Sequence, residues 1–208
     1  RHPQRGSLMG TVLRATVLAA AISMTGAFAV QAADPITGLV PATPQPAAEQ
    51  LQPGLALTYY FNRFNETREI PDWAKYKPGV KGEPILLLDY FVGDGDVLTS
   101  GRADGVGADI NGYINFPVAG TYTIAMQSND GVDLNIGGKR VVYDPLVHSN
   151  RFSDLIPVEI TEPGWYPLHL LCFEKQITAT LEQYWLRPGG GGQLDFVPEE
   201  AFAHRSGQ

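Results

Sequence analysis

Hydrophobic and polar residues alternate along much of the second half of this chain, with the period of two that is typical of β-strands. Two such runs between residues 112 and 142 place hydrophobic side chains on one face: Tyr122, Ile124 and Met126 in the first, Val132, Leu134 and Ile136 in the second. They flank a Ser-Asn-Asp-Gly turn at 128–131, and the Gly-Gly pair at 137–138 predicts a two-residue hairpin turn. The pattern predicts an antiparallel meander with one buried face.

Further strands are predicted from the same alternation at 55–61, 158–160, 168–172 and 179–183. The unbroken apolar run 85–92 has the length of a strand and is expected in the middle of the fold. Residues 62–84 are rich in charge and proline, which predicts a long connection with a short helical turn near 72–76. Eight or more short strands with almost no helix predict an all-β fold, an antiparallel β-sandwich.

The first 32 residues have the pattern of a secretory signal peptide. Arg14 precedes an apolar run, and Val30-Gln31-Ala32 is a small-residue cleavage site, so cleavage is expected after Ala32. The alternative is that residues 11–32 stay as a membrane anchor, since they approach the length needed to span a bilayer. Residues 1–8 precede the first Met and show no periodicity. Both interpretations predict that the chain is exported from the cytoplasm, to the periplasm, the cell surface or the extracellular space.

Three further segments follow the leader. Residues 33–53, rich in Pro and Ala, are expected to be a linker, since they contain little core-forming material. Residues 54–198 form the predicted sandwich domain, and residues 199–208 are expected to be a flexible tail.

Composition narrows the class of partner. The chain has a formal net charge of −7, and removal of the leader with its three arginines leaves 12 basic against 22 acidic residues, a charge of −10. Such acidity argues against nucleic acid as a partner and is compatible with neutral glycans or cations. The single cysteine, Cys172, excludes intramolecular disulfides and is expected to be a small buried hydrophobe.

Several motifs, in their order along the chain, resemble the PA14 domain family, a β-sandwich known from anthrax protective antigen, fungal adhesins and inserts in glycosidases. The matching features lie within about 54–198 and comprise Gly120-x-Tyr122-x-Ile124, the Ser128-Asn129-Asp130-Gly131 turn followed by Leu134-x-Ile136-x-Gly138, Pro163-Gly164-Trp165-Tyr166-Pro167, Phe173-Glu174, and a closing strand 181–185. The resemblance implies the same sandwich.

In sugar-binding members of that family, two successive acidic residues joined by a cis peptide bond hold a calcium ion that bridges to sugar hydroxyls, together with groups from another loop. Here Asn129 replaces the first acidic residue and Asp130 keeps its carboxylate, so calcium affinity is expected to fall or vanish. The resemblance implies that Glu174 or Gln176 approaches from the partner loop. The alternative for Asp130 is that it only caps its turn through the backbone.

Two other features are candidates for chemistry. Trp165 follows a turn and could present its ring to a sugar, although burial is the usual state of tryptophan. The acidic cluster Gly93-Asp94-Gly95-Asp96 lacks the oxygen ligands that an EF-hand requires, which favours a solvated loop. The chain shows no recognisable catalytic motif.

The sequence therefore predicts an exported, non-catalytic binding module, with carbohydrate as the leading ligand and calcium as a possible cofactor. Its predicted ligand-binding residues are Asn129, Asp130, Glu174, Gln176 and Trp165, of which Asn129 and Asp130 are the predicted metal ligands. The alternative is a structural or assembly protein of the cell envelope that binds protein partners through the sandwich surface, without metal or sugar.

Overall fold

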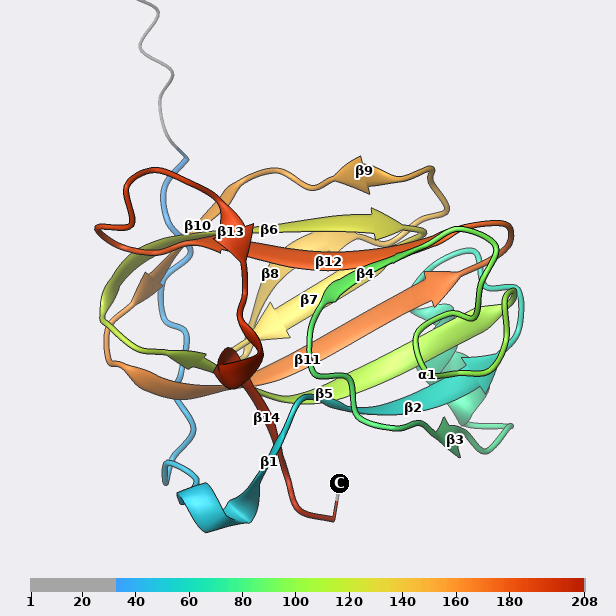
Figure 1. Ribbon diagram of the computed structural model, residues 1–208, viewed down its shortest axis with the longest axis horizontal. Helices are drawn as coiled ribbons and strands as arrows, with labels where there is room; N and C mark the ends of the chain where they lie inside the picture. Colours follow the sequence, from blue (N-terminus) through green and yellow to red (C-terminus); the bar gives the residue numbers. More distant parts are fainter. Residues whose placement is uncertain (1–32, 208) are drawn as a thin grey trace, which may run out of the picture. The chain divides into compact units, whose positions relative to one another are not determined.

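The computed structural model describes residues 33–207, which form two antiparallel β-sheets packed face to face (Figure 1). One sheet has eight strands: β1 (Leu51–Pro53), β2 (Ala56–Phe61), β3 (Val80–Lys81), β5 (Val106–Phe116), β7 (Val132–Ile136), β8 (Lys139–Asp144), β11 (Gly164–Glu174) and β14 (Phe202–Arg205). The other has six: β4 (Asp89–Val92), β6 (Gly120–Asn129), β9 (Arg151–Phe152), β10 (Ile156–Ile160), β12 (Ala179–Leu186) and β13 (Asp195–Phe196). The described helices are short: α1 (Glu69–Ala74) and the 3-10 turns η1 (Ala48–Gln50) and η2 (Glu199–Ala201).

The predicted β-sandwich is confirmed. The eight-stranded sheet runs β1-β14-β5-β11-β7-β8, with β2 and β3 at its side, and the six-stranded sheet is centred on β6 and β12. The alternating residues predicted to share a face are buried between the sheets, among them Tyr122, Ile124 and Met126 on β6. At one end of the core the rings of Phe116, Tyr122, Tyr166 and Trp185 pack together.

The glycines predicted to form a hairpin do so. Gly137 and Gly138 connect β7 to β8 and have φ of 55° and 77°. That left-handed region is unfavourable for residues with a Cβ atom, which explains why two glycines are needed in this turn.

The run 85–92 differs from its prediction as one strand in the middle of the fold. Ile85 forms an isolated bridge with Leu55, whereas β4 begins only at Asp89 and pairs with β12 in the other sheet. Asp89 is exposed, because burying an unpaired charge is costly, whereas its neighbour Leu88 is buried in the core. The short helical turn expected near 72–76 is present as α1, beginning three residues earlier.

Residues 33–53, predicted to be a linker, instead lie against the sandwich. Ile36 bridges to Val158 of β10, Leu39 is buried in the core, and β1 pairs with β14. The Gln45 side chain holds the segment in place, because its amide donates to the carbonyl of Trp165 at 2.9 Å and its Oε1 accepts the Trp165 N–H at 2.7 Å. Specific hydrogen bonds add to the few apolar contacts that the segment makes.

The predicted flexible tail is also largely ordered in the structure. β14 pairs with both β1 and β5, and Phe202 is buried in the core at 2 % exposure. The strand has only four residues and its first three are all buried, so it shows no alternating pattern that would predict it from the sequence.

The predicted signal peptide, residues 1–32, lies outside the described residues. Within residues 33–207, no helix is both long enough and apolar enough to cross a membrane.

Candidate functional site

The turn at 128–131 carries the chain from one sheet to the other. It leaves β6 of the six-stranded sheet and enters β7 of the eight-stranded sheet, so it lies at one end of the sandwich. The peptide bond between Asn129 and Asp130 is cis. The turn, the loop 145–150 after β8 and the bend 174–178 between β11 and β12 are called the rim loops below.

Asp130 joins the three rim loops. Its side chain is only 5 % exposed, and its Oδ1 accepts the backbone N–H of His148 at 3.1 Å while its Oδ2 accepts that of Lys175 at 2.8 Å. Its own N–H donates to the carbonyl of Phe173 at 2.9 Å. Burial raises the pKa of the Asp130 carboxyl, and the two backbone donors oppose that rise.

Asn129 connects the turn to the far side of the bend. Its Nδ2 donates to Thr178 Oγ1 at 2.8 Å, and the residue is half-buried. Beyond that contact, Gln176 and Ile177 are exposed at the tip of the bend, with Ile177 at 66 % exposure and a φ of 85°. The Ile177 N–H donates to Asp104 Oδ1 at 2.9 Å, which stabilises this unfavourable backbone conformation. The structure thus brings Asn129, Asp130 and Gln176 to the same rim.

Glu174, the fourth predicted ligand, faces inward. It is 1 % exposed, its Oε2 accepts the N–H of Gly105 at 3.2 Å, and its Oε1 has no hydrogen-bond partner within the described structure. Burial, with the nearby carboxylates of Asp104 and Asp130, raises the pKa of Glu174 to about 7. Its side chain is therefore not accessible to a ligand at the surface.

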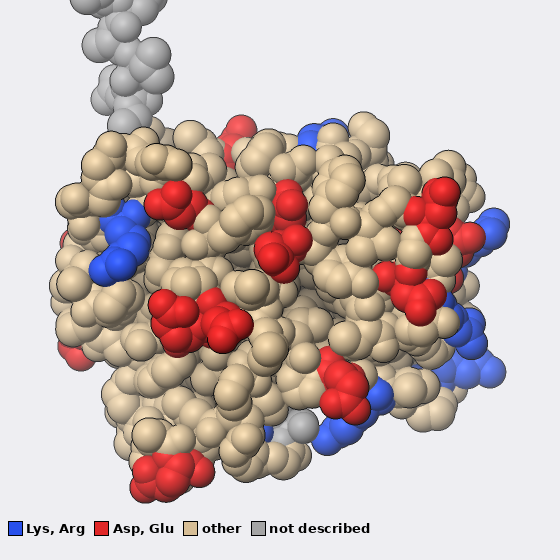
Figure 2. Space-filling view, viewed as in Figure 1, with Lys and Arg blue, Asp and Glu red and all other residues tan. Residues whose placement is uncertain are grey.

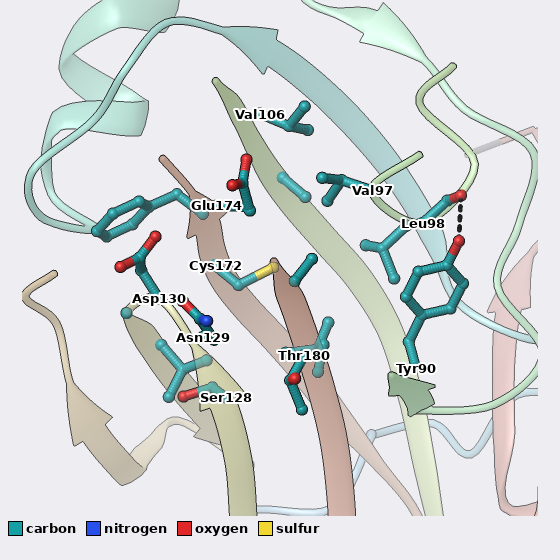
Figure 3. A pocket seen from close by; sticks show the side chains of 16 residues that line it. Tyr90, Val97, Leu98, Val106, Ser128, Asn129, Asp130, Cys172, Glu174 and Thr180 are labelled. Carbon is teal, nitrogen blue, oxygen red and sulfur yellow. Dashed lines mark hydrogen bonds between the residues drawn. The ribbon is translucent and has the colours of Figure 1, made fainter. Parts of the chain in front are cut away.

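A small cavity lies between the sheets beneath the turn (Figure 3). Figure 3 shows Asp130, Glu174 and Cys172 on one side of it, with Leu98 and Tyr90 opposite. Its volume is about 20 Å³, room for about one water molecule. A ligand the size of a sugar must bind on the exposed side of the rim loops, and not beneath them.

Trp165 is not part of this rim. It lies near the start of β11, whereas Glu174 ends the same strand, and nine residues of strand span about 30 Å. Trp165 lines a separate surface groove with Leu51 and Leu86. The structure therefore separates the predicted aromatic ligand from the other four predicted residues.

Residues 145–150 and Lys175 were not predicted as part of the site. His148 and Lys175 contribute backbone N–H groups, which no side-chain pattern in the sequence identifies. In residues 33–207, no cluster of three or more His, Cys, Asp or Glu side chains has an arrangement that could hold a metal ion.

The sequence model of the PA14 domain family matches residues 51–195, a range that contains the turn, the loop and the bend. This chain belongs to the PA14 domain family. The match covers well over half of the chain and begins at β1. No curated protein sequence matches the chain.

Solved structures of PA14 domains have the same fold as this PA14 domain. The PA14 domain of the MpAFP antifreeze protein matches with a TM-score of 0.63 at 16% identity, covering 78% of this chain and 96% of that one. A PA14 sugar-binding domain from an RTX adhesin matches with a TM-score of 0.59 at 14% identity, covering 73% and 98%. The Epithelial Adhesin 9 A domain of Candida glabrata, in complex with Galb1-4GlcNAc, matches with 0.60 at 12% identity, covering 81% and 98%.

Proposed function

We propose that this PA14 domain is a non-catalytic module that binds carbohydrate through the exposed side of its rim loops. The observation that carries the proposal is the contact between the turn and the bend, in which Asn129 Nδ2 donates to Thr178 Oγ1 at 2.8 Å. Loops held together at one end of a rigid sandwich are a common place for binding sites.

The chemistry of this rim suits a neutral sugar. Asn129 and Gln176 offer amide groups that both donate and accept hydrogen bonds, as sugar hydroxyls do, and the exposed Ile177 beside them offers an apolar contact. Two of the similar solved structures are described as a sugar-binding domain and as a complex with Galb1-4GlcNAc, which adds support at the level of the family.

The charge of the protein also favours a neutral ligand. Acidic side chains, drawn in red, are spread over the face shown in Figure 2, and the chain has a formal net charge of −7. Polyanions such as nucleic acids would be repelled by this surface.

Binding, and not hydrolysis, is the activity that the geometry supports. A glycosidase needs two carboxyl groups that flank the bound sugar and reach the glycosidic bond. The carboxyl groups of Asp130 and Glu174 are 5 % and 1 % exposed, and both accept backbone hydrogen bonds. Neither is free to approach a substrate.

Calcium is the predicted cofactor, and the residues present fit it only weakly. Calcium takes six to eight oxygen ligands. The turn offers the Asp130 carboxylate, whose two oxygens each already accept a backbone N–H, and the Asn129 Oδ1 atom. We propose that Asn129 and Asp130 hold calcium and that the affinity for it is low. Titration with CaCl₂ followed by calorimetry, with an EDTA-treated sample as reference, tests this.

We also propose that the domain acts outside the cytoplasm. The apolar N-terminal run and its small-residue cleavage site favour export. Similar structures come from proteins described as adhesins, which fits an extracellular role. N-terminal sequencing of the secreted or periplasmic fraction tests the expected start at Ala33.

A glycan array tests the proposed function. Fluorescently labelled protein should bind at least one printed glycan, and Asn129→Ala and Gln176→Ala should each reduce that signal. Gln52→Ala, which changes an exposed glutamine on β1 outside the rim loops, is the matched control. Absence of binding to every glycan, with and without calcium, would overturn the proposal and favour a protein partner.

A further inference from the structure

A second hollow lies beside the rim loops, between α1 and the chain that leads into it. Its volume is about 360 Å³, within the range of about 300–1,000 Å³ that is typical of small-molecule sites. It is lined by Asn62, Arg63, Asn65, Glu69, Asp72, Trp73 and Tyr76. We call it the α1 groove.

Two aromatic side chains line the α1 groove. Trp73 is half-buried and meets Phe64 edge to face, with ring centroids 6.4 Å apart and planes at 90°. Phe64 belongs to a small core beneath α1 that includes Phe173, so the Trp73 ring is held by packing. Tyr76, one turn further on, is 80 % exposed. Aromatic faces of this kind pack against the apolar faces of sugar rings, because both are flat and apolar.

Polar side chains surround these rings. Asn62 and Arg63 are exposed, and no hydrogen bond to either side chain is present in the described structure. Glu69 is oriented by accepting the Asn65 N–H at 2.8 Å. Asp72, also in the groove, forms an ion pair with Lys75 at 2.7 Å, and Arg63 and Glu69 add one charge of each sign to the lining. The groove combines aromatic rings, amides and balanced charges, which favours a neutral ligand rich in hydroxyl groups.

One residue links the α1 groove to the rim loops. The Lys175 side chain donates to Asn65 Oδ1 at 2.7 Å, and the Lys175 backbone N–H donates to Asp130 Oδ2 at 2.8 Å. Asn65 lines the groove, and Asp130 belongs to the turn. The two regions are thus neighbours on one surface, and a ligand longer than one sugar can contact both. In Figure 1, α1 lies at the same end of the sandwich as the ends of β6 and β11.

We propose that the α1 groove is a second saccharide subsite, which makes this domain a binder of neutral oligosaccharides rather than of single sugars. The inference rests on the proposed function, because it places one sugar unit on the rim loops. The next unit lies in the α1 groove, against Trp73 and Tyr76, and its hydroxyls bond to Asn62 and Arg63.

The test compares single sugars with the oligosaccharides that contain them. An array prints neutral monosaccharides beside neutral di-, tri- and tetrasaccharides built from them, and calorimetry measures the best oligosaccharide and each of its component monosaccharides. The wild-type domain should bind the oligosaccharide more tightly than any component. Tyr76→Ala should weaken oligosaccharide binding by about two- to tenfold, the scale of one lost aromatic contact, and leave monosaccharide binding unchanged.

The two groove variants are expected to fold, because each changes an exposed side chain. Tyr76 and Asn62 are both exposed, so Tyr76→Ala and Asn62→Ala change the groove without disturbing a core. Tyr143→Ala is the matched control, because Tyr143 is also an exposed tyrosine, at 52 %, and lies on β8 outside the groove. It should leave both affinities unchanged.

The two failures are distinguishable. If no glycan of any length binds, or if Asn129→Ala has no effect on a glycan that does, the proposed function fails. If oligosaccharides bind no more tightly than their monosaccharides, or if Tyr76→Ala and Asn62→Ala both leave oligosaccharide affinity equal to that of Tyr143→Ala, the groove is not a subsite. In that second case the rim loops remain the proposed site. Preference for sialylated or sulfated glycans over neutral ones would also overturn the assignment of the groove to a neutral ligand.

Discussion

Asp130 accepts the backbone N–H of Lys175 at 2.8 Å, although the two residues are 45 positions apart in the chain. The bond joins the turn that follows β6 to the bend that follows β11. A second bond from the same carboxylate, to the N–H of His148, adds the loop after β8. One buried side chain therefore sets the relative positions of all three rim loops, and the Asp-Gly pair of the turn has a structural role whether or not a ligand binds.

Asp130→Ala is expected to destabilise the fold. It removes the acceptor of two backbone N–H groups, and leaving buried donors unsatisfied costs about 1–3 kcal/mol. Urea unfolding should show this loss in the free energy of unfolding. Asp94→Ala, at an exposed position of the 93–96 loop, is the control and should be neutral. Equal stability of the two variants would contradict the role assigned to Asp130.

Glu174 should make stability depend on pH near neutrality. Its pKa is about 7 in the folded protein against an ordinary value of 4.5, so the folded state keeps a proton that the unfolded chain releases. Its contribution to the free energy of unfolding is full below about pH 4.5 and is lost as the pH rises through 7. Glu174→Gln should therefore gain stability relative to wild type between pH 5 and pH 8.

Thermal unfolding across that pH range measures the effect. Glu159→Gln, which changes an exposed glutamate on β10, is the control and should follow the wild-type curve. If the difference between Glu174→Gln and wild type is the same at pH 5 and pH 8, Glu174 does not titrate in this interval.

The sandwich could be predicted because its physical cause is local. A period of two in side-chain polarity and two glycines in a tight turn both act over a few residues, and the sequence displays them directly. The prediction that the Asn129 turn lies beside the bend rested on the order of the family motifs along the chain. The predicted accessibility of Glu174 came from the resemblance, whereas the alternation along β11 places Glu174 on the same buried face as Leu170 and Cys172.

The segments mispredicted as linker and tail lack that local signal. Residues 33–53 and 202–205 are held by hydrogen bonds to distant strands, such as that from Ala42 N–H to the carbonyl of Trp165 at 2.8 Å. Polar contacts between residues more than a hundred positions apart leave no periodic pattern. Trp165 was predicted as a ligand together with residues at the far end of β11, and a strand separates its two ends by its full length.

Gln45→Ala should loosen the N-terminal segment. The Gln45 side chain makes three hydrogen bonds, two to the backbone of Trp165 and one to the carbonyl of Ala42. Their loss should lower the free energy of unfolding by about 1 kcal/mol, since the residue is exposed and water replaces part of the bonding. Amide exchange at Ala42 should also accelerate. Gln176→Ala, at an exposed glutamine whose side chain makes no hydrogen bond in the described structure, is the control for stability.

Asn129→Asp should strengthen calcium binding, because it places a second carboxylate on the turn beside Asp130. Calcium affinity in oxygen sites rises with the number of charged ligands, and a gain of about tenfold corresponds to about 1.4 kcal/mol. The side chain can still bond to Thr178, whose hydroxyl is able to donate to a carboxylate. Without calcium, repulsion between the adjacent carboxylates should lower the melting temperature, so the stabilisation on adding CaCl₂ should exceed that of wild type.

Asn115→Asp adds the same charge on β5 opposite Trp165, away from the rim loops, and should not acquire calcium binding. Calorimetric affinities for Asn129→Asp and Asn115→Asp that do not differ would show that the turn does not bind calcium even with two carboxylates.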